Sequence, residues 1–585
     1  MAFRRHNLFV QRPQTILTLP RLTPALLLQT HDHSNTVAIP NTRGKSHVRY
    51  AVSSRNSTDP FIARRSANYH PNIWDYEFVE SLTSDYKSEI YTNRAQKLRE
   101  NVRAMFVGAS GLPCSLKLID TVQRLGLDYH FRSDIKSDNH FSQDDLTIEA
   151  LRFRLYRQHG YEISQDVLKN FVEETNQNKG KVKDLEGLLS LYEASFYACE
   201  GEEILNEARQ VITKHLKNCL NERNDNNRSN MSIFLEKEIS HSLELPLLWR
   251  VPRMEVRRFI TMYEKKQDIY PSLLELAKLD FNMVQATYHE ELKYASRWWR
   301  DLALHESLSF ARNRLVECFF WNIGFNSESE FGNLRKQMTK ICNLVSVIDD
   351  VYDVYGSLDA LKMFTEAIQR WDINTVDNLP QYMKICFTIK ELGYEVLRNS
   401  NLDVMPYLKK SWGDLCKAFL VEATWYYSGY IPTLEEYTDN AWITIAGPLV
   451  SVHAYSQLGD QEIRREALEY MNNNQSDLIR WSSMIFRLAD DLATSKKEQE
   501  RGDVAKSIEC YMHETGASES IAREHVQQLI SDAWEKMNTS LSASRGVFPS
   551  SFIQNIGRMG QYMYQYGDGY GTSNRESKDR IIHYC

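Results

Sequence analysis

The chain of 585 residues has little glycine and proline, 24 and 15 residues, which excludes a collagenous protein. Its hydrophobic fraction of 42% excludes a wholly disordered one. No apolar run approaches the ~18 residues that a membrane span needs, and the best stretch, residues 25–28, is far too short. Alternating β-branched runs between turn residues are nearly absent as well. What is present is a long, aromatic-rich chain that needs more than one domain.

The usual cysteine and histidine patterns of metal and disulfide proteins are also missing. The nine cysteines form no CxxC pair and are odd in number, so neither a zinc ribbon nor a disulfide scaffold is predicted. The sixteen histidines include no HExxH, the commonest zinc signature on a helix. The net charge of −7 gives no reason to expect nucleic-acid binding.

Acidic residues are scarce in the first 63 residues, where Asp32 and Asp59 stand against eight arginines and lysines. This leader therefore carries a charge of +6, which leaves −13 for the rest of the chain. A basic, acid-poor leader that contains serine and threonine is typical of an organelle transit peptide, which is removed after import. We interpret residues 1–63 in this way; the alternative is a disordered basic tail.

Apolar residues recur at spacings of three and four from residue 72 onward, which predicts an all-α body. Pro271 follows the polar segment 263–270 and marks a plausible helix start. We therefore expect two helical domains, over residues 75–268 and 269–585.

A first acidic motif ends the apolar segment that begins at residue 344. On a helix, Asp349 and Asp353 share one face, whereas Asp350 turns away. Neighbouring carboxylates on an apolar helix repel each other, which makes sense if a divalent cation lies between them. So few hard oxygen ligands suit Mg²⁺ or Mn²⁺, completed by water and phosphate oxygens. The alternative is a helix end in solvent.

A second acidic stripe lies near the C-terminus, where Asp490, Thr494 and Glu498 follow at i, i+4 and i+8 on one helix face. Arg487 points to the same side, and Lys506 follows shortly after. Cations beside metal-binding acids indicate a ligand with its own negative charge, and a diphosphate fits. The alternative is an ordinary charged surface helix.

Two arginines, Arg312 and Arg314, are expected on the helix that runs into the aromatic residues 319–321. Charge above an aromatic run suits an amphiphile with a diphosphate head and a hydrocarbon tail. Trp321 lies two turns beyond Arg314 on the same face, and is a candidate for the pocket floor or a core residue.

These motifs, in this order, resemble those of plant class I terpene synthases: RxR at 312–314, DDxxD at 349–353 and the NSE/DTE motif at 490–498. Residues 64–74 resemble the RRx8W segment of plastidial monoterpene synthases. The resemblance covers the whole mature chain. It implies an all-α fold, with a C-terminal class I terpenoid synthase α-bundle around an active-site cavity and an N-terminal relic α-barrel domain.

The resemblance also implies roles for single residues. Asp349 and Asp353 would hold two Mg²⁺ ions and Asp350 would orient an arginine, while Mn²⁺ could replace Mg²⁺. The remaining charged and hydroxyl residues divide into ligands of a third ion (Asp490, Thr494, Glu498), contacts of the departing diphosphate (Arg312, Arg314, Arg487, Lys506) and a capping strand that serves isomerisation of geranyl diphosphate to linalyl diphosphate (Arg64, Arg65).

Other residues would shape the pocket. Those expected to line it are Trp321, Cys342, Ser346 and Thr444, the last beside a helix interruption at Gly447 and Pro448. Tyr564 or Tyr570 would guide the final deprotonation in a loop that closes over the site, with Asp568 as a hinge contact. The implied enzyme converts geranyl diphosphate into a monoterpene in the plastid stroma, as a monomer or weak homodimer.

Several alternatives stay open at this point. The RRx8W match favours a cyclic product derived from an α-terpinyl cation, but acyclic linalool, myrcene or ocimene need only earlier quenching. A sesquiterpene synthase and a non-catalytic helical scaffold remain further options. A chain-elongating prenyltransferase needs a second DDxxD, which residues 490–494 do not supply, and a class II cyclase needs DxDD, where this chain has Val347.

Overall fold

The structure is a computed structural model, and it describes Tyr69 and most of residues 71–584. The segments left out within that range are 110, 135–144, 178–183, 223–230, 303, 305–307, 372–382, 384–402, 459–460, 473–476, 544–549 and 572–574. By its contacts the chain divides into two units, Met1–Ala63 and Arg64–Cys585. The first unit, which is the predicted leader, lies outside the described residues, as do Arg64 and Arg65.

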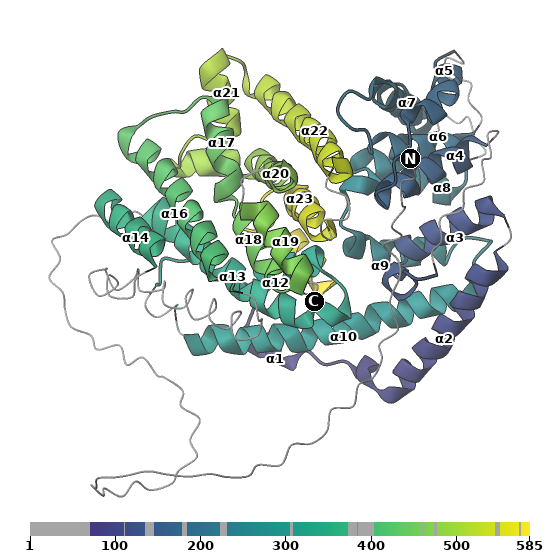
Figure 1. Ribbon diagram of the computed structural model, residues 1–585, viewed down its shortest axis with the longest axis horizontal. Coiled ribbons are helices and arrows are strands. Elements are labelled where there is room, and N and C mark those ends of the chain that lie inside the picture. Colours follow the sequence, from purple (N-terminus) through teal and green to yellow (C-terminus); the bar gives the residue numbers. More distant parts are fainter. Residues whose placement is uncertain are drawn as a thin grey trace, which may run out of the picture. The chain divides into compact units, whose positions relative to one another are not determined.

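The N-terminal part of the described chain is a set of helices (Figure 1). Their bounds are α1 Tyr76–Ser81, α2 Glu89–Gly108, α3 Leu112–Arg124, α4 Leu146–Gln158, α5 Lys169–Gln177, α6 Leu185–Ser195, α7 Glu203–Glu222, α8 Ile233–Glu244 and α9 Pro252–Tyr263. Short 3-10 turns lie at Asp85–Lys87, Asp128–His130, Gln165–Leu168 and Leu247–Trp249.

The C-terminal part begins with the long helix α10, which lies beside α2 (Figure 1). Its helices are α10 Pro271–Leu302, α12 Leu315–Phe325, α13 Gly332–Asp350, α14 Leu358–Arg370, α16 Met405–Ser428, α17 Leu434–Thr444, α18 Gly447–Tyr455, α19 Gln461–Asn472, α20 Asp477–Arg501, α21 Ser507–Thr515, α22 Glu519–Ala543, α23 Ser551–Tyr564 and α24 Arg575–Ile582. A 3-10 turn at Ser329–Phe331 precedes α13, and a π-helical turn at Val351–Tyr355 follows it.

The described residues contain no strand, which confirms the predicted all-α class of two helical domains. No described helix is both long and apolar enough to cross a lipid bilayer. Helix α10 begins at Pro271, where the proline predicts a start, because the first helical position needs no backbone N–H donor. The boundary between residues 268 and 269 stays a prediction.

Local chemistry fixes the ends of the helices that carry the site. The Thr433 hydroxyl accepts from the Glu436 N–H (3.2 Å) and the Glu436 carboxylate accepts from the Thr433 N–H (2.9 Å), a capping box that starts α17. Gly429, at φ 67°, ends α16 in the left-handed conformation that favours glycine. These caps set where the buried faces of α16 and α17 meet.

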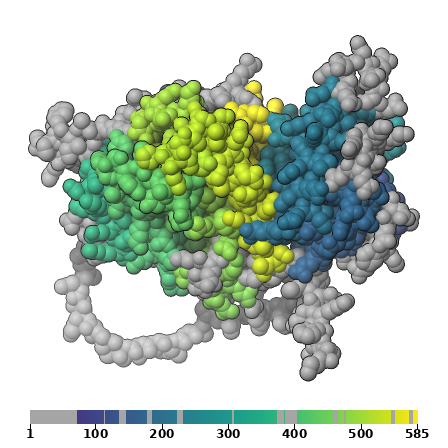
Figure 2. All heavy atoms as spheres, turned by 90° about the horizontal axis from the view of Figure 1, so that it is seen from above, coloured from purple at the N-terminus to yellow at the C-terminus, as the bar shows by residue number. Residues whose placement is uncertain are grey.

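Helix α20 lies at the centre of the C-terminal part, packed against α22 and α23 on one side and α17 and α18 on the other. A separate apolar core around Trp412, Phe419, Tyr352 and Phe364 joins α14 and α16 to the end of α13. In the space-filling view, yellow C-terminal residues lie against the blue helices of the N-terminal part (Figure 2). Trp249 stacks on Trp534 there, at 5.7 Å between ring centroids.

One local prediction is wrong. Arg312 and Arg314 do not lie on the helix, since α12 begins at Leu315; the Arg312 N–H donates instead to the Asp350 carboxylate (2.7 Å), a tertiary contact that keeps this segment outside the helix. The helix interruption predicted at Gly447 and Pro448 is present, since α17 ends at Thr444 and α18 begins at Gly447 with the proline in its first turn. The break lies before them, at Ala446, whose φ of 64° costs a non-glycine residue roughly 1 kcal/mol.

Candidate active site

The DDxxD motif lies where α13 changes into the π-helical turn Val351–Tyr355, so Asp353 lies in a wider turn than the predicted α-helical spacing assumes. Such single-turn π segments are frequent at functional sites. Burial first, and then the charge of Asp349, raise the pKa of Asp353 well above its ordinary value, so the two carboxylates still act on each other. The turn therefore keeps two carboxylates together at the helix end.

Arg312 is the cation that faces this motif. One of its guanidinium nitrogens, Nη2, lies 2.5 Å from Asp349 Oδ2 and 2.8 Å from Asp350 Oδ1. Asp350 is fully buried and so is placed against an arginine rather than toward solvent. Arg314, also buried, donates from Nη2 to the Gly571 carbonyl (2.9 Å) and thereby holds the C-terminal loop.

The second acidic stripe runs along α20 as the spacing predicts. Arg487 Nη1 contacts Asp490 Oδ2 at 2.8 Å, and the Thr494 hydroxyl donates back to the Asp490 carbonyl (3.0 Å). Burial, opposed by Arg487 and reinforced by Glu498, raises the pKa of Asp490 to about 8. Burial is also the main reason that the pKa of Glu498 is raised. Negative charge in this stripe is thus only partly neutralised.

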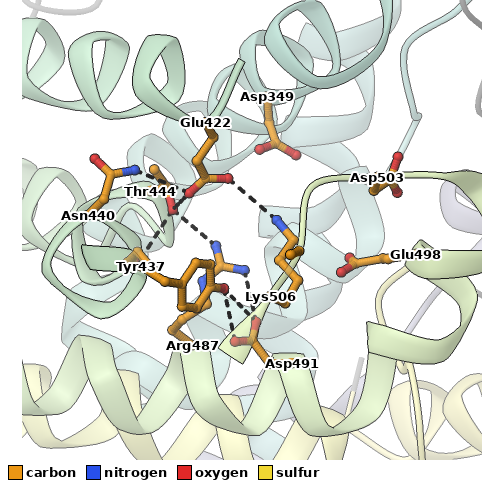
Figure 3. A network of polar contacts seen from close by, with 12 residues as sticks. Asp349, Glu422, Tyr437, Asn440, Thr444, Arg487, Asp491, Glu498, Asp503 and Lys506 are labelled. Atoms are coloured by element: carbon orange, nitrogen blue, oxygen red, sulfur yellow. Dashed lines mark hydrogen bonds and ion pairs between the residues drawn. The ribbon is translucent and has the colours of Figure 1, made fainter. Parts of the chain in front are cut away.

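A buried glutamate that the sequence analysis missed joins these elements. Glu422, on α16, accepts from the Thr444 hydroxyl (2.7 Å) and from the Lys506 ammonium (3.4 Å). Figure 3 shows Asp349, Glu498 and Asp503 around the same ammonium group. Glu422 follows Phe419 by three residues on the buried face of α16, and a carboxylate on that apolar face is the signal that could have identified it.

Asp491, the second acid of the α20 motif, has a positioning role in this network. It is fully buried and accepts from the Tyr437 hydroxyl at 2.9 and 3.0 Å and from the Ser507 N–H at 3.2 Å. The Ser507 contact fixes the start of α21 directly after Lys506. Asp491 thereby anchors the segment that carries the lysine (Figure 3).

An aromatic cluster contains the predicted pocket-floor residue. The Trp321 ring stacks on Phe486 (4.7 Å between centroids, 22°) and lies 6.2 Å from both Tyr564 and Tyr570. Phe486 was not predicted, although it directly precedes Arg487 on α20. Trp321 is buried and belongs to the larger apolar core. It therefore both packs in the core and contacts the aromatic residues of the candidate site.

Tyr570 connects this cluster to α13. Its hydroxyl hydrogen-bonds with the Ser346 hydroxyl and lies 3.5 Å from Cys318 Sγ. Burial is the first cause that raises the pKa of Cys342 to about 11, so that its thiol stays protonated. Asp568 accepts from the Tyr570 and Gly571 N–H groups (3.1 and 2.6 Å) and shapes the turn that presents Tyr570.

The donors present suit a hard divalent cation. Among the described residues, no three His, Cys, Asp or Glu side chains are close enough together to surround one ion. However, Glu498 Oε2 is buried without a hydrogen-bond partner, and the pKa values of Asp353, Asp490 and Glu498 are all raised. These carboxylates are not fully neutralised by neighbouring cations. Carboxylate and hydroxyl oxygens are the ligands that Mg²⁺ and Mn²⁺ prefer.

Comparison with known proteins identifies the family. Residues 73–243 match the model of the terpene synthase N-terminal domain, and residues 300–536 match that of the terpene synthase metal-binding domain. "Terpene synthase 10" of Ricinus communis is 50% identical over 550 residues, which cover 90% of this chain and 98% of the relative. The chain belongs to the terpene synthase family. A chloroplastic myrcene synthase of Quercus ilex is 45% identical over 96% of this chain and 94% of its own length.

Solved structures of terpene synthases share the fold. Limonene synthase with 2-fluorolinalyl diphosphate superposes with a TM-score of 0.83 at 40% identity, over 89% of this chain and 99% of that chain. Isoprene synthase from grey poplar leaves, in complex with three Mg²⁺ ions and dimethylallyl-S-thiolodiphosphate, gives 0.74 at 39% identity, over 87% and 98%. The terpene synthase fold and its metal-binding domain are therefore present in this chain.

Proposed function

We propose that this terpene synthase converts geranyl diphosphate into a cyclic monoterpene and releases diphosphate. The observation that carries the proposal is the meeting of carboxylates from α13, α16 and α20 around Lys506 and Arg487 (Figure 3). The RRx8W motif and the similarity to limonene synthase with a linalyl diphosphate analogue support a cyclic product by way of linalyl diphosphate.

The acidic residues would bind the metal ions. We assign Asp349 and Asp353 to two Mg²⁺ ions and Asp490, Thr494 and Glu498 to a third, with Mn²⁺ as a substitute. The similarity to isoprene synthase with three Mg²⁺ ions supports this number. When bound, these ions neutralise charge on the departing diphosphate oxygens.

The chain's own cations would hold the leaving group, and the residues assigned to it are Arg312, Arg314, Arg487 and Lys506. The carbon–oxygen bond breaks and its electron pair leaves on the diphosphate, which these side chains stabilise. Their paired carboxylates, Asp349 for Arg312 and Glu422 for Lys506, orient them before substrate arrives.

The aromatic cluster would accommodate the allylic cation. The faces of Trp321 and Phe486 stabilise positive charge without forming a bond, and packed side chains exclude water that would quench it. Cys342, Ser346 and Thr444 would shape the pocket, and Tyr564 or Tyr570 would guide loss of the final proton. Arg64 and Arg65 would assist the return of diphosphate to the third carbon, which forms linalyl diphosphate.

We further propose that residues 1–63 direct the protein to the plastid stroma, as chloroplastic relatives suggest. The mature enzyme would then comprise the strand 64–74 and domains 75–268 and 269–585, as a monomer or weak homodimer.

The test is incubation of the chain from Arg64 onward with Mg²⁺ and either geranyl or farnesyl diphosphate, followed by gas chromatography–mass spectrometry. A cyclic monoterpene from geranyl diphosphate supports the proposal. An acyclic product overturns the cyclic assignment, a product from farnesyl diphosphate alone indicates a sesquiterpene synthase, and no volatile from either contradicts the enzymatic function.

A further inference from the structure

Tyr69, which no motif assigns a role, lies between the two metal motifs. Its ring faces the Arg312 guanidinium, with Cζ 4.6 Å from the ring centroid. Arg501, the last residue of α20, lies over the same ring at 5.9 Å. Arg312 belongs to the Asp349 and Asp350 cluster, whereas Arg501 pairs with Glu498 (3.8 Å) and Asp503 (3.0 Å). One aromatic ring therefore contacts the cation of each acidic motif.

The segment that carries Tyr69 is also attached to the protein at Trp74. Trp74 is buried, and its indole N–H donates to Glu317 Oε1 at 2.9 Å, on the first turn of α12. Tyr69 contacts Arg312 and Trp74 contacts Glu317. Tyr69 and Trp74 are five positions apart in the sequence, and so are Arg312 and Glu317. Tyr69 and Trp74 therefore both contact the stretch 312–317, which gives the Tyr69 ring a defined place.

We propose that Tyr69 is a positioning residue for the diphosphate site. Its ring contacts the Arg312 and Arg501 guanidinium groups and thereby keeps the DDxxD motif and the helix of the NSE/DTE motif in a fixed position relative to each other. This inference rests on the proposed function. The Arg312 guanidinium lies over two rings, Tyr69 at 4.6 Å and Tyr570 at 5.9 Å, while its Nη2 contacts the carboxylates of Asp349 and Asp350. A guanidinium held by its faces presents its N–H edge to an anion.

The ring, rather than the hydroxyl, carries this role. Burial first, with the neighbouring acids, raises the pKa of Tyr69 well above its ordinary value, so the phenol stays neutral and its π face is available. Loss of the ring should free Arg312 to rotate and should admit water beside the departing diphosphate.

The experiment compares Tyr69→Leu, Tyr69→Phe and a matched control, Tyr294→Leu. Tyr294 also faces two cations, Lys336 at 5.0 Å and Lys340 at 5.2 Å, but lies on α10. Calorimetry measures the Kd of inorganic pyrophosphate in saturating Mg²⁺. We expect Tyr69→Leu to weaken binding about tenfold and to raise the share of acyclic and hydroxylated products from geranyl diphosphate, with Tyr69→Phe and Tyr294→Leu within twofold of wild type.

Two results overturn the proposal. One is pyrophosphate binding by Tyr69→Leu equal to that of Tyr294→Leu, and the other is an equal loss in Tyr69→Phe and Tyr69→Leu. If Tyr69→Leu does not fold, as judged by circular dichroism, Tyr69→Met takes its place under the same criteria. A wild-type protein that binds pyrophosphate but forms no terpene would contradict the proposed function instead.

A double-mutant cycle tests the bridge itself. Arg501→Gln should weaken pyrophosphate two- to threefold in the wild type and have no further effect in Tyr69→Leu, because the ring that it contacts is already gone. Additive losses would show that the two residues act separately and would overturn the bridging role.

Discussion

Glu238 in the N-terminal helices and two acids of the C-terminal metal motifs, Asp353 and Asp490, have opposite electrostatics. Glu238, on α8, is buried between Arg124 and Arg258, and although burial raises its pKa, the two arginines outweigh this and lower it to about 2. Asp490 is also buried and Asp353 is half-buried, yet their pKa values are raised. Glu238 is paired with two arginines, whereas the C-terminal site holds more negative charge than its own cations neutralise.

This difference separates structural from functional charge. A buried ion pair with all its partners fixes the packing of helices, and removal of one member leaves an unpaired charge. A site with surplus carboxylates is less stable alone but can bind external cations. We therefore expect substitutions in the two regions to affect stability and activity in opposite ways.

The largest expected effect is on activity at α20. Asp490→Asn removes a proposed metal ligand and should lower kcat by about 10²- to 10³-fold. It also relieves repulsion with Glu498 and Asp491, so the melting temperature of the metal-free protein should stay level or rise. Turnover by gas chromatography and thermal unfolding in chelator measure the two effects. Full activity in Asp490→Asn would remove this residue from the metal site.

Asp349→Ala also removes a proposed metal ligand and should lower turnover about as much as Asp490→Asn does. The helical circular dichroism spectrum should stay unchanged. A matched control is Asp359→Ala, an exposed acid on α14 whose side chain is 94% accessible. Equal activity in the two variants would argue against Asp349 as a ligand.

A smaller loss is expected for Glu422→Gln, which keeps the shape of the side chain but removes the charge that faces Lys506. We expect about a tenfold fall in kcat/KM, as the ammonium group loses its buried partner. The steady-state kinetics with geranyl diphosphate decide this, and wild-type values would mean that Glu422 only packs.

The acidic stripes of α13 and α20 could be predicted from the sequence because a helix places residues four apart on one face. Glu422 and Tyr69 lie on segments whose distance from the motifs is set by tertiary packing, so the spacing of the motifs does not place them at the site. Phe486 lies on α20 itself, but its contact with Trp321 of α12 is also a tertiary one. Arg312 lies beside the DDxxD motif, but the local structure predicted for it is wrong. Its backbone contact with Asp350, 38 residues away, keeps it outside the helix, and no local pattern encodes that contact.

In the N-terminal helices the main effect should be on stability. Glu238→Gln leaves Arg124 and Arg258 without their buried carboxylate and should lower the free energy of unfolding by about 3 kcal/mol in urea titrations. The activity per folded molecule should not change. Glu275→Gln is the control, because its pair with Arg94 is exposed and should contribute little.

The stability of the metal-free protein should depend on pH through both the lowered pKa of Glu238 and the raised pKa of Asp490. Glu238, whose pKa is lowered, contributes stability above its ordinary pKa of 4.5 that is lost as the pH falls toward 2. Asp490, whose pKa is raised to about 8, binds its proton more tightly when folded, so stability falls as the pH rises from about 4 to 8. Thermal unfolding from pH 2 to 9 in chelator checks both changes, and Asp490→Asn should flatten the decline between about pH 4 and 8.

The central claim is that the surplus carboxylates bind divalent cations together with a diphosphate. Its most direct test is the melting temperature of the wild-type protein at pH 8 with chelator, with Mg²⁺ alone and with Mg²⁺ plus inorganic pyrophosphate, compared with Asp490→Asn. By mass action, the wild type should gain several degrees with Mg²⁺ plus pyrophosphate and the variant should gain little. No gain in the wild type, or an equal gain in Asp490→Asn, would contradict the account.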